Sequence, residues 1–271
     1  MGRVKKVSQT SGISKQDNYN YASSTFYYKN TSKIKTIISF LDYWKVKNNM
    51  NVDVEASTYN MHGKLLSREK IDLTKSNVKN IYPLNKNNGE GAIEIKIYSK
   101  KNLRVPYAAI MGIYQTQFGI TAVHSYSRYY YQKENILNIG YEGSWTIRDS
   151  KNISSFCVFH NGTAIQKAQI VKFQIHNEKS DILNINVKLP AIPKNGTIKI
   201  KLSDHVENLE AFLCGGIGVV SSEHQVKKSF SRMLIGNESK KDGLDMQVTH
   251  SNFNYKIHGS DLLDKNAVSL K

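Results

Sequence analysis

The chain has 271 residues, of which 39% are hydrophobic, and 38 basic against 22 acidic residues give a formal net charge of +16 at pH 7. This length and composition suffice for one large or two ordinary cores, which excludes an intrinsically disordered protein. The two cysteines, Cys157 and Cys214, both lie among apolar residues, so we expect buried free thiols and neither a disulfide framework nor a four-cysteine zinc site.

The first 20 residues are polar and basic and have no hydrophobic periodicity, so we expect residues 1–20 to form a disordered basic arm. This segment lacks the apolar core of a signal peptide, and no run of 18 apolar residues follows anywhere in the sequence. We therefore expect a cytoplasmic protein without a transmembrane segment.

Beyond this arm, short segments alternate apolar and polar residues between turns rich in Asn, Gly, Lys and Ser. Alternation with a period of two is typical of strands that have one buried and one solvated face. In the first half of the chain these predicted strands are residues 34–40, 52–56, 91–99, 109–114 and a final strand through His124. The abundance of Ile, Val, Thr, Tyr and Phe also favours strands.

The same series recurs in the second half. We match residues 34–40 with 153–159, 52–56 with 170–175, 91–99 with 196–203, 109–114 with 232–237, and Val-His-Ser at 123–125 with Val-Thr-His-Ser at 248–251. Such a repeat predicts an all-β fold of two tandem, internally duplicated β-sandwich modules related by pseudo-two-fold symmetry. We place copy 1 at 21–138, copy 2 at 141–255 and a polar C-terminal tail at 256–271.

Part of the second copy resembles a known family. The run Phe156-Cys157-Val158-Phe159-His160-Asn161-Gly162, then Ala168, the strand after Gly196 and the step Phe230-Ser231-Arg232 are similar to the small β-sandwich of the sensory rhodopsin transducer family. The resemblance implies an oligomer-forming, non-enzymatic module that binds a partner. It transfers no individual site residue to this chain.

The two histidine strands are the best candidate site. If each runs on as one strand, alternation places His124, Tyr126 and Arg128 on one face in copy 1, and His250, Asn252 and Asn254 on one face in copy 2. The pseudo-two-fold relation would then bring the two sets together in a polar cleft between the copies. Arginine, amide and aromatic groups in such a cleft suit a carboxylate or a sugar.

Other kinds of site receive less support from the sequence. The histidines do not occur as His-x-His or His-x-x-x-His, so we expect no metal and no cofactor. Ser125 and Ser251 directly follow the histidines and would face the opposite side of the strand, which argues against a nucleophilic pair. The aromatic and basic stretch 126–133 leaves single-stranded nucleic acid open as a partner.

These observations favour a non-enzymatic double β-sandwich that acts as a binding or adaptor protein. Its partner would be an anionic or carbohydrate ligand or an acidic protein surface, because the excess positive charge lies mainly in the first copy. Three alternatives stay open, namely a self-assembling structural protein, a histidine-dependent sugar-modifying enzyme and a single-stranded nucleic-acid binder. A homo-oligomer is compatible with each of them.

Overall fold

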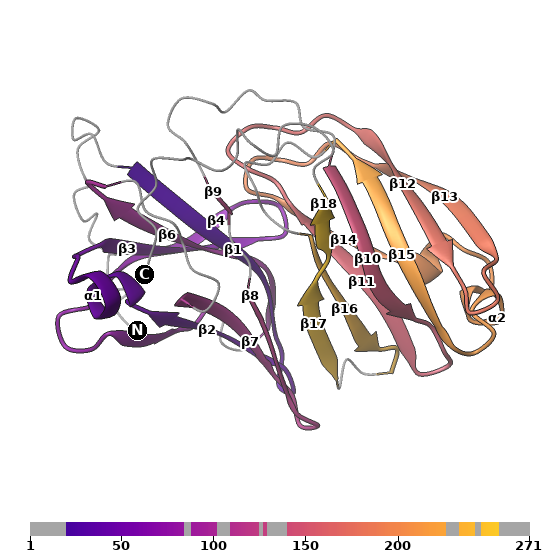
Figure 1. Ribbon diagram of the computed structural model, residues 1–271, viewed down its shortest axis with the longest axis horizontal. Coiled ribbons are helices and arrows are strands. Elements are labelled where there is room, and N and C mark those ends of the chain that lie inside the picture. Colours follow the sequence, from indigo (N-terminus) through magenta and orange to yellow (C-terminus); the bar gives the residue numbers. More distant parts are fainter. Residues whose placement is uncertain are drawn as a thin grey trace, which may run out of the picture.

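The computed structural model describes residues 20–83, 88–101, 109–124, 127–128, 140–225, 233–241 and 245–254. In these residues the fold is all-β, and four antiparallel sheets form two sandwich modules, which confirms the predicted fold class (Figure 1). The predicted arm and tail lie almost entirely outside the described residues.

Module 1 is formed by the first nine strands. Its five-stranded sheet has the order β4-β3-β6-β1-β9, with β1 (Asn20–Asn30), β3 (Asp53–Asn60), β4 (Leu65–Ile71), β6 (Gly89–Ser99) and β9 (Ser127–Arg128). Its four-stranded sheet has the order β5-β2-β7-β8, with β2 (Lys35–Leu41), β5 (Val78–Ile81), β7 (Ile110–Gln115) and β8 (Ile120–His124).

Module 2 is formed by the next nine strands. Its five-stranded sheet has the order β13-β12-β15-β10-β18, with β10 (Gly140–Arg148), β12 (Gln169–His176), β13 (Ile182–Leu189), β15 (Ile217–His224) and β18 (Asn252–Asn254). Its four-stranded sheet has the order β14-β11-β16-β17, with β11 (Ile153–His160), β14 (Thr197–Lys201), β16 (Leu234–Ser239) and β17 (Met246–His250).

Each strand of module 1 thus has its counterpart nine strands later, which confirms the duplication at the level of topology. The pairing is wrong in one place. We matched residues 91–99 with residues 196–203. The first segment lies in β6, in the middle of a five-stranded sheet, whereas the second contains β14, at the edge of a four-stranded sheet. The counterpart of β6 is β15. Both segments alternate Ile with charged residues, and alternation alone does not identify the sheet to which a strand belongs.

Hydrogen bonds fix the equivalence of the modules residue by residue. Lys29 donates its N–H to Thr36 Oγ1 (3.0 Å), whose hydroxyl donates to the Lys29 carbonyl. Arg148 and Ser155 make the same reciprocal pair at 2.7 and 2.8 Å. Thr36 therefore corresponds to Ser155, as the sequence match predicted. The pairing of β2 with β7 and of β11 with β16 extends this residue-by-residue correspondence to the neighbouring strands.

The inward faces of the two sheets in each module form its core. In module 1 Phe26, Ile38, Phe40 and Ile93 are fully buried, and in module 2 Phe159, Phe173 and Val220 have the same role. Both tryptophans are core residues, with 0% exposure for Trp44 and 3% for Trp145. Cys157 is a buried free thiol, but Cys214 is exposed, which corrects our expectation. Cys214 lies in a turn, with φ 55°, just before Gly215, rather than in a strand.

The helical segments include α1 (Tyr43–Asn48), the 3₁₀ segment η2 (Leu202–Asp204) and α2 (Leu209–Phe212), all of them short. Asp42 caps α1 by accepting the backbone N–H of Lys45 at 3.0 Å. In the described part of the chain, no helix has the length and apolar character needed to span a membrane.

Candidate functional site at the contact between the modules

The four-stranded sheet of module 2 is buried on both sides. Its inner face packs in the core of module 2, and its outer face packs against module 1. We call this outer face the covered face, and its apolar side chains, none more than 3% exposed, are Phe156, Val158, Leu234, Met246 and Val248. All of them belong to the same hydrophobic cluster as the core of module 1, so the two modules share one apolar interior.

One part of module 1 that contacts the covered face is the outer face of its five-stranded sheet, which we call the covering face. Tyr27 on β1 is fully buried, and its ring centroid lies 6.0 Å from that of Phe156. At the far end of the interface, the turn after β3 extends the contact, where Thr197 donates its N–H to the Met61 carbonyl at 2.9 Å. A Cβ on Gly63 in this turn would lie only 2.0 Å from the Lys194 carbonyl oxygen, so the close approach requires glycine.

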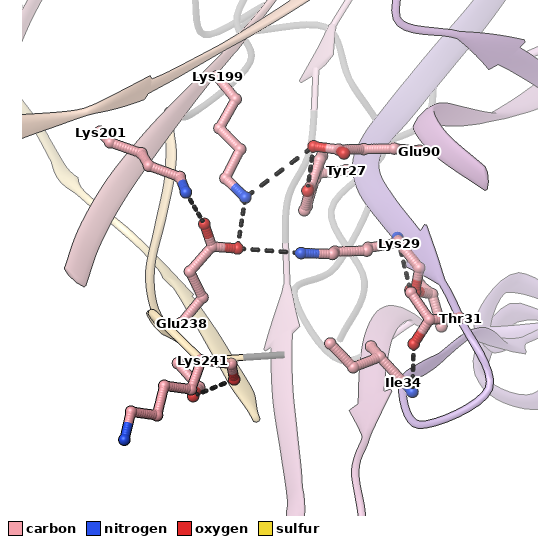
Figure 2. A network of polar contacts seen from close by, with 11 residues as sticks. Tyr27, Lys29, Thr31, Ile34, Glu90, Lys199, Lys201, Glu238 and Lys241 are labelled. Atoms are coloured by element: carbon pink, nitrogen blue, oxygen red, sulfur yellow. Dashed lines mark hydrogen bonds and ion pairs between the residues drawn. The ribbon is translucent and has the colours of Figure 1, made fainter. Parts of the chain in front are cut away.

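Charged groups lie beside this apolar contact, since the Lys199 ammonium lies over the Phe156 ring, and Figure 2 shows the network that they form. Glu238 on β16 has a 4% exposed side chain and binds three lysine Nζ atoms. Its Oε2 lies 2.6 Å from Lys199 and 3.1 Å from Lys29, and its Oε1 lies 2.9 Å from Lys201. Lys29 belongs to module 1, so the carboxylate joins the two modules directly.

A second carboxylate extends the network into module 1. Glu90 on β6 accepts a 2.5 Å hydrogen bond from the Tyr27 hydroxyl and lies 3.9 Å from Lys199 Nζ. The Lys199 ammonium also lies 4.4 Å from the ring centroid of Phe156 and 5.7 Å from that of Tyr27. It is therefore held by ion pairs and by two aromatic rings.

The ion network changes the acidity of its members. Burial alone would raise the pKa of Glu238, but the ammonium groups of Lys199, Lys201 and Lys29 lower it by more, to about 2. Burial lowers the pKa of Lys199, and Glu238 partly offsets this effect. Glu238 is thus ionised at any physiological pH, and the interface contains a permanent buried anion.

The equivalent edge strands β8 and β17 also lie side by side (Figure 1). Val248 donates its N–H to Thr121 Oγ1 at 3.3 Å, and the Thr116 hydroxyl donates to Asp245 at 3.0 Å. The network around Glu238, in contrast, joins strands that are not equivalent. Equivalent strands of the two modules therefore meet at the edge of the contact, whereas non-equivalent strands meet across its faces.

The two histidines meet at this edge. The ring centroids of His124 and His250 are 4.5 Å apart, with the ring planes at 60°, and both side chains are half-buried. The ring nitrogen Nδ1 of His250 donates to the Ser251 carbonyl at 2.8 Å, which places a proton on that nitrogen. The predicted meeting of the two histidine strands between the modules is thus found in the structure.

The other predicted site residues do not lie on the same strands as the histidines. Strand β8 ends at His124, and Arg128 lies in β9, which pairs with β1 in the opposite sheet of module 1. Likewise Asn252 and Asn254 lie in β18, paired with β10, after the chain crosses between sheets at the buried Ser251. The expectation of one continuous strand in each copy was wrong, because Ser127 and Arg128 already pair in the opposite sheet in copy 1, and Asn252 does so in copy 2. Tyr126 lies outside the described residues.

A small polar cavity lies where β11 meets the covering face. It is lined on one side by Thr25, Tyr59 and Glu94 and on the other by His160 and Asn161. Burial raises the pKa of Glu94, although Lys96 and Ser23 counteract part of that rise. His160 is 3% exposed, and its Nδ1 lies 2.9 Å from Thr197 Oγ1. The Asn161 amide donates to the carbonyls of Ala164, Ile192 and Pro193, which is typical of a polar residue that holds neighbouring backbone in place.

Sequence reasoning missed Glu238 and its lysines as the centre of the contact. The available signal was weak, because Glu238 is the single acidic residue of its strand, and Lys29 lies 209 positions away from it. Among the described residues, no group of three or more His, Cys, Asp or Glu side chains could hold a metal ion. No family model and no curated protein matches this chain, so the resemblance to the sensory rhodopsin transducer family stays a prediction.

Proposed function

We propose that this chain is a non-enzymatic binding protein that recognises another protein through a sheet face of module 1. The relevant surface is the outer face of the four-stranded sheet of module 1, which we call the open face. Its apolar side chains come from three adjacent strands, β2, β7 and β8, and are Ile37, Met111, Ile113, Ile120 and Ala122.

One observation supports the proposal above all others. The open face is the counterpart of the covered face, yet Ile120 is 66% exposed while its equivalent Met246 is 1% exposed. Phe118, in the turn beside β8, is also 66% exposed, and Val78 on β5 is 52% exposed. Contiguous exposed apolar residues on a sheet are typical of a surface that binds a partner. The equivalent face in the same chain is covered by a β-sandwich, so a protein surface is the natural partner.

Photo-crosslinking in extracts of the source cells tests this proposal. With a photoreactive phenylalanine at Ile120, we expect one discrete protein adduct, because the open face would hold its partner there. Glu69 is the matched control position, since it is exposed on β4 of the same module, away from the open face. Equal adducts at both positions, or no adduct at Ile120, would contradict the proposal.

A small anionic or carbohydrate ligand at the edge between the modules is the second candidate, and the 4.5 Å separation of the His124 and His250 rings favours it. If such a ligand binds, sulfate, acetate or glucose should shift the imidazole NMR signals of both histidines in a saturable way. His124→Gln should abolish the shift of the remaining His250 signal. His62 is exposed in a turn of module 1 and is the control, because its signal should not respond.

A further inference from the structure

The chain has four outer sheet faces, and the contact between its modules uses two of them. The covering face of module 1 and the covered face of module 2 pack together, which leaves the open face of module 1 and the outer face of the five-stranded sheet of module 2. We call this last surface the distal face. In Figure 1 it lies at the end of the molecule remote from module 1.

The two unused faces are the counterparts of the two used ones. The open face corresponds to the covered face, and the distal face corresponds to the covering face. In this register Ile37 takes the place of Phe156, and Val219 takes the place of Ala92, which packs beside Tyr27. The face-to-face part of this contact could therefore be repeated between two chains, whereas the edge strands β8 and β17 already lie beside each other within each chain.

The distal face carries exposed apolar groups on the strands that such a contact would use. Ile217 and Val219 on β15 are 49% and 45% exposed, and Ile182 on β13 is 54% exposed. Ile182 and Val219 lie in one row across the sheet, on either side of His176. Their inward neighbours Gly218 and Val220 are buried in the core of module 2, so the exposed set belongs to the outer side of the sheet.

The ion network of the internal contact is not repeated on the unused faces. Glu238, Lys199 and Lys201 correspond to Gln115, Asn80 and Tyr82 on the open face. On the distal face, Glu90 and Tyr27 of the covering face correspond to Ile217 and Thr146. Both unused faces thus lack counterparts of the two carboxylates, and the counterparts of Lys199 and Lys201 are uncharged. Lys29 alone corresponds to a charged residue, the exposed Arg148 of the distal face. Contact between the two faces would therefore bury no carboxylate without its cation.

From this correspondence we infer that the open face binds the distal face of a second copy of this chain, so that chains assemble head to tail. The inference rests on the proposed function and names its partner. Because the two faces differ, the contact is heterologous and each added copy exposes a new open or distal face. Growth is open-ended unless the rotation between copies closes a ring.

Two complementary variants of the full-length chain test the inference. One replaces Ile120 and Ala122 with Lys and blocks the open face, and the other replaces Ile217 and Val219 with Lys and blocks the distal face. All four side chains are exposed, so the fold should be retained, as circular dichroism and the melting temperature would verify. Ile165→Lys is the control, because this residue is 71% exposed and lies on neither face.

By light scattering, the wild type and the Ile165→Lys control should grow beyond dimers as concentration rises, and more readily at high salt, because screening weakens the repulsion between copies of charge +16. Each blocked variant alone should stay monomeric. An equimolar mixture of the two should form a species of two chains and no larger, since one intact face of each kind remains.

The inference is overturned if the wild type stays monomeric, if either blocked variant still grows, or if the mixture stays monomeric. Its failure can be distinguished from failure of the proposed function by the adduct at Ile120. An adduct with a different protein retains the proposed function and rejects self-assembly, whereas the absence of any adduct rejects both.

Discussion

Replacing Glu238 with Gln is expected to lower the free energy of unfolding by about 3–5 kcal/mol, the range typical when one partner of a buried ion pair is removed. The carboxylate is 4% exposed and balances Lys199, whose side chain is only 10% exposed. Gln cannot neutralise the three ammonium groups, so the folded state would retain uncompensated buried charge. Urea unfolding followed by circular dichroism measures the change.

Glu223→Gln is the matched control. Glu223 pairs with Lys172 at 3.2 Å, but their side chains are 35% and 64% exposed, and we expect a loss of about 0–1 kcal/mol. Equal losses from the two substitutions would show that the network at Glu238 does not stabilise the contact between the modules.

The same network predicts a distinct response to acid. The pKa of Glu238 is about 2 in the folded protein and near 4.5 in a free side chain, so ionisation favours the folded state above pH 4.5. This contribution is lost as the pH falls from about 4.5 towards 2, because the unfolded chain then binds the proton first. The Glu238→Gln variant should lack that part of the pH dependence, and the difference between the two unfolding profiles measures it.

Phe156→Ala is expected to cost about 3–5 kcal/mol, as removal of a buried aromatic side chain usually does. Its ring is 1% exposed, packs against Tyr27 of module 1 and lies beneath the Lys199 ammonium. The cavity would open within the apolar interior that the modules share, so both modules should lose stability together.

Ile37→Ala provides a control at the equivalent position of the open face. Because Ile37 is only half-buried, the expected loss is about 1 kcal/mol when the protein is dilute. Both values come from urea unfolding at low protein concentration. If the two substitutions cost the same, the open and covered faces would be equally buried, and the difference on which the proposed function rests would disappear.

The sequence was sufficient to predict the architecture, and the reason is visible in particular strands. Alternation identified β2 and β11, and the match of 34–40 with 153–159 was correct to the residue, because the inward positions Ile38 and Phe40 correspond to the buried Cys157 and Phe159. The signature around His124 and His250 indicated a histidine-bearing strand late in each copy, and β8 and β17 do meet between the modules. Local patterns of this kind reflect burial, which strand alternation records directly.

The errors concern features that depend on distant parts of the chain. Periodicity could not place β14 at an edge, because a strand's neighbours are set by pairing across the fold. It could not detect the change of sheet at Ser251, since two short strands separated by one residue look like one longer strand. The network at Glu238 was invisible for a related reason, as its lysines come from β1 and β14 and converge only after both modules have folded.

The order in which the chain is synthesised matters for the folding of the covered face. Translation starts at the N-terminal side, so β1 and β6, which supply the covering face, leave the ribosome before β11, β16 and β17. A folded module 1 can thus serve as a template on which the apolar face of module 2 is sheltered as it emerges. A circular permutant that begins with module 2 would expose Phe156, Leu234 and Val248 to solvent during synthesis, and aggregation at that stage would be its characteristic failure.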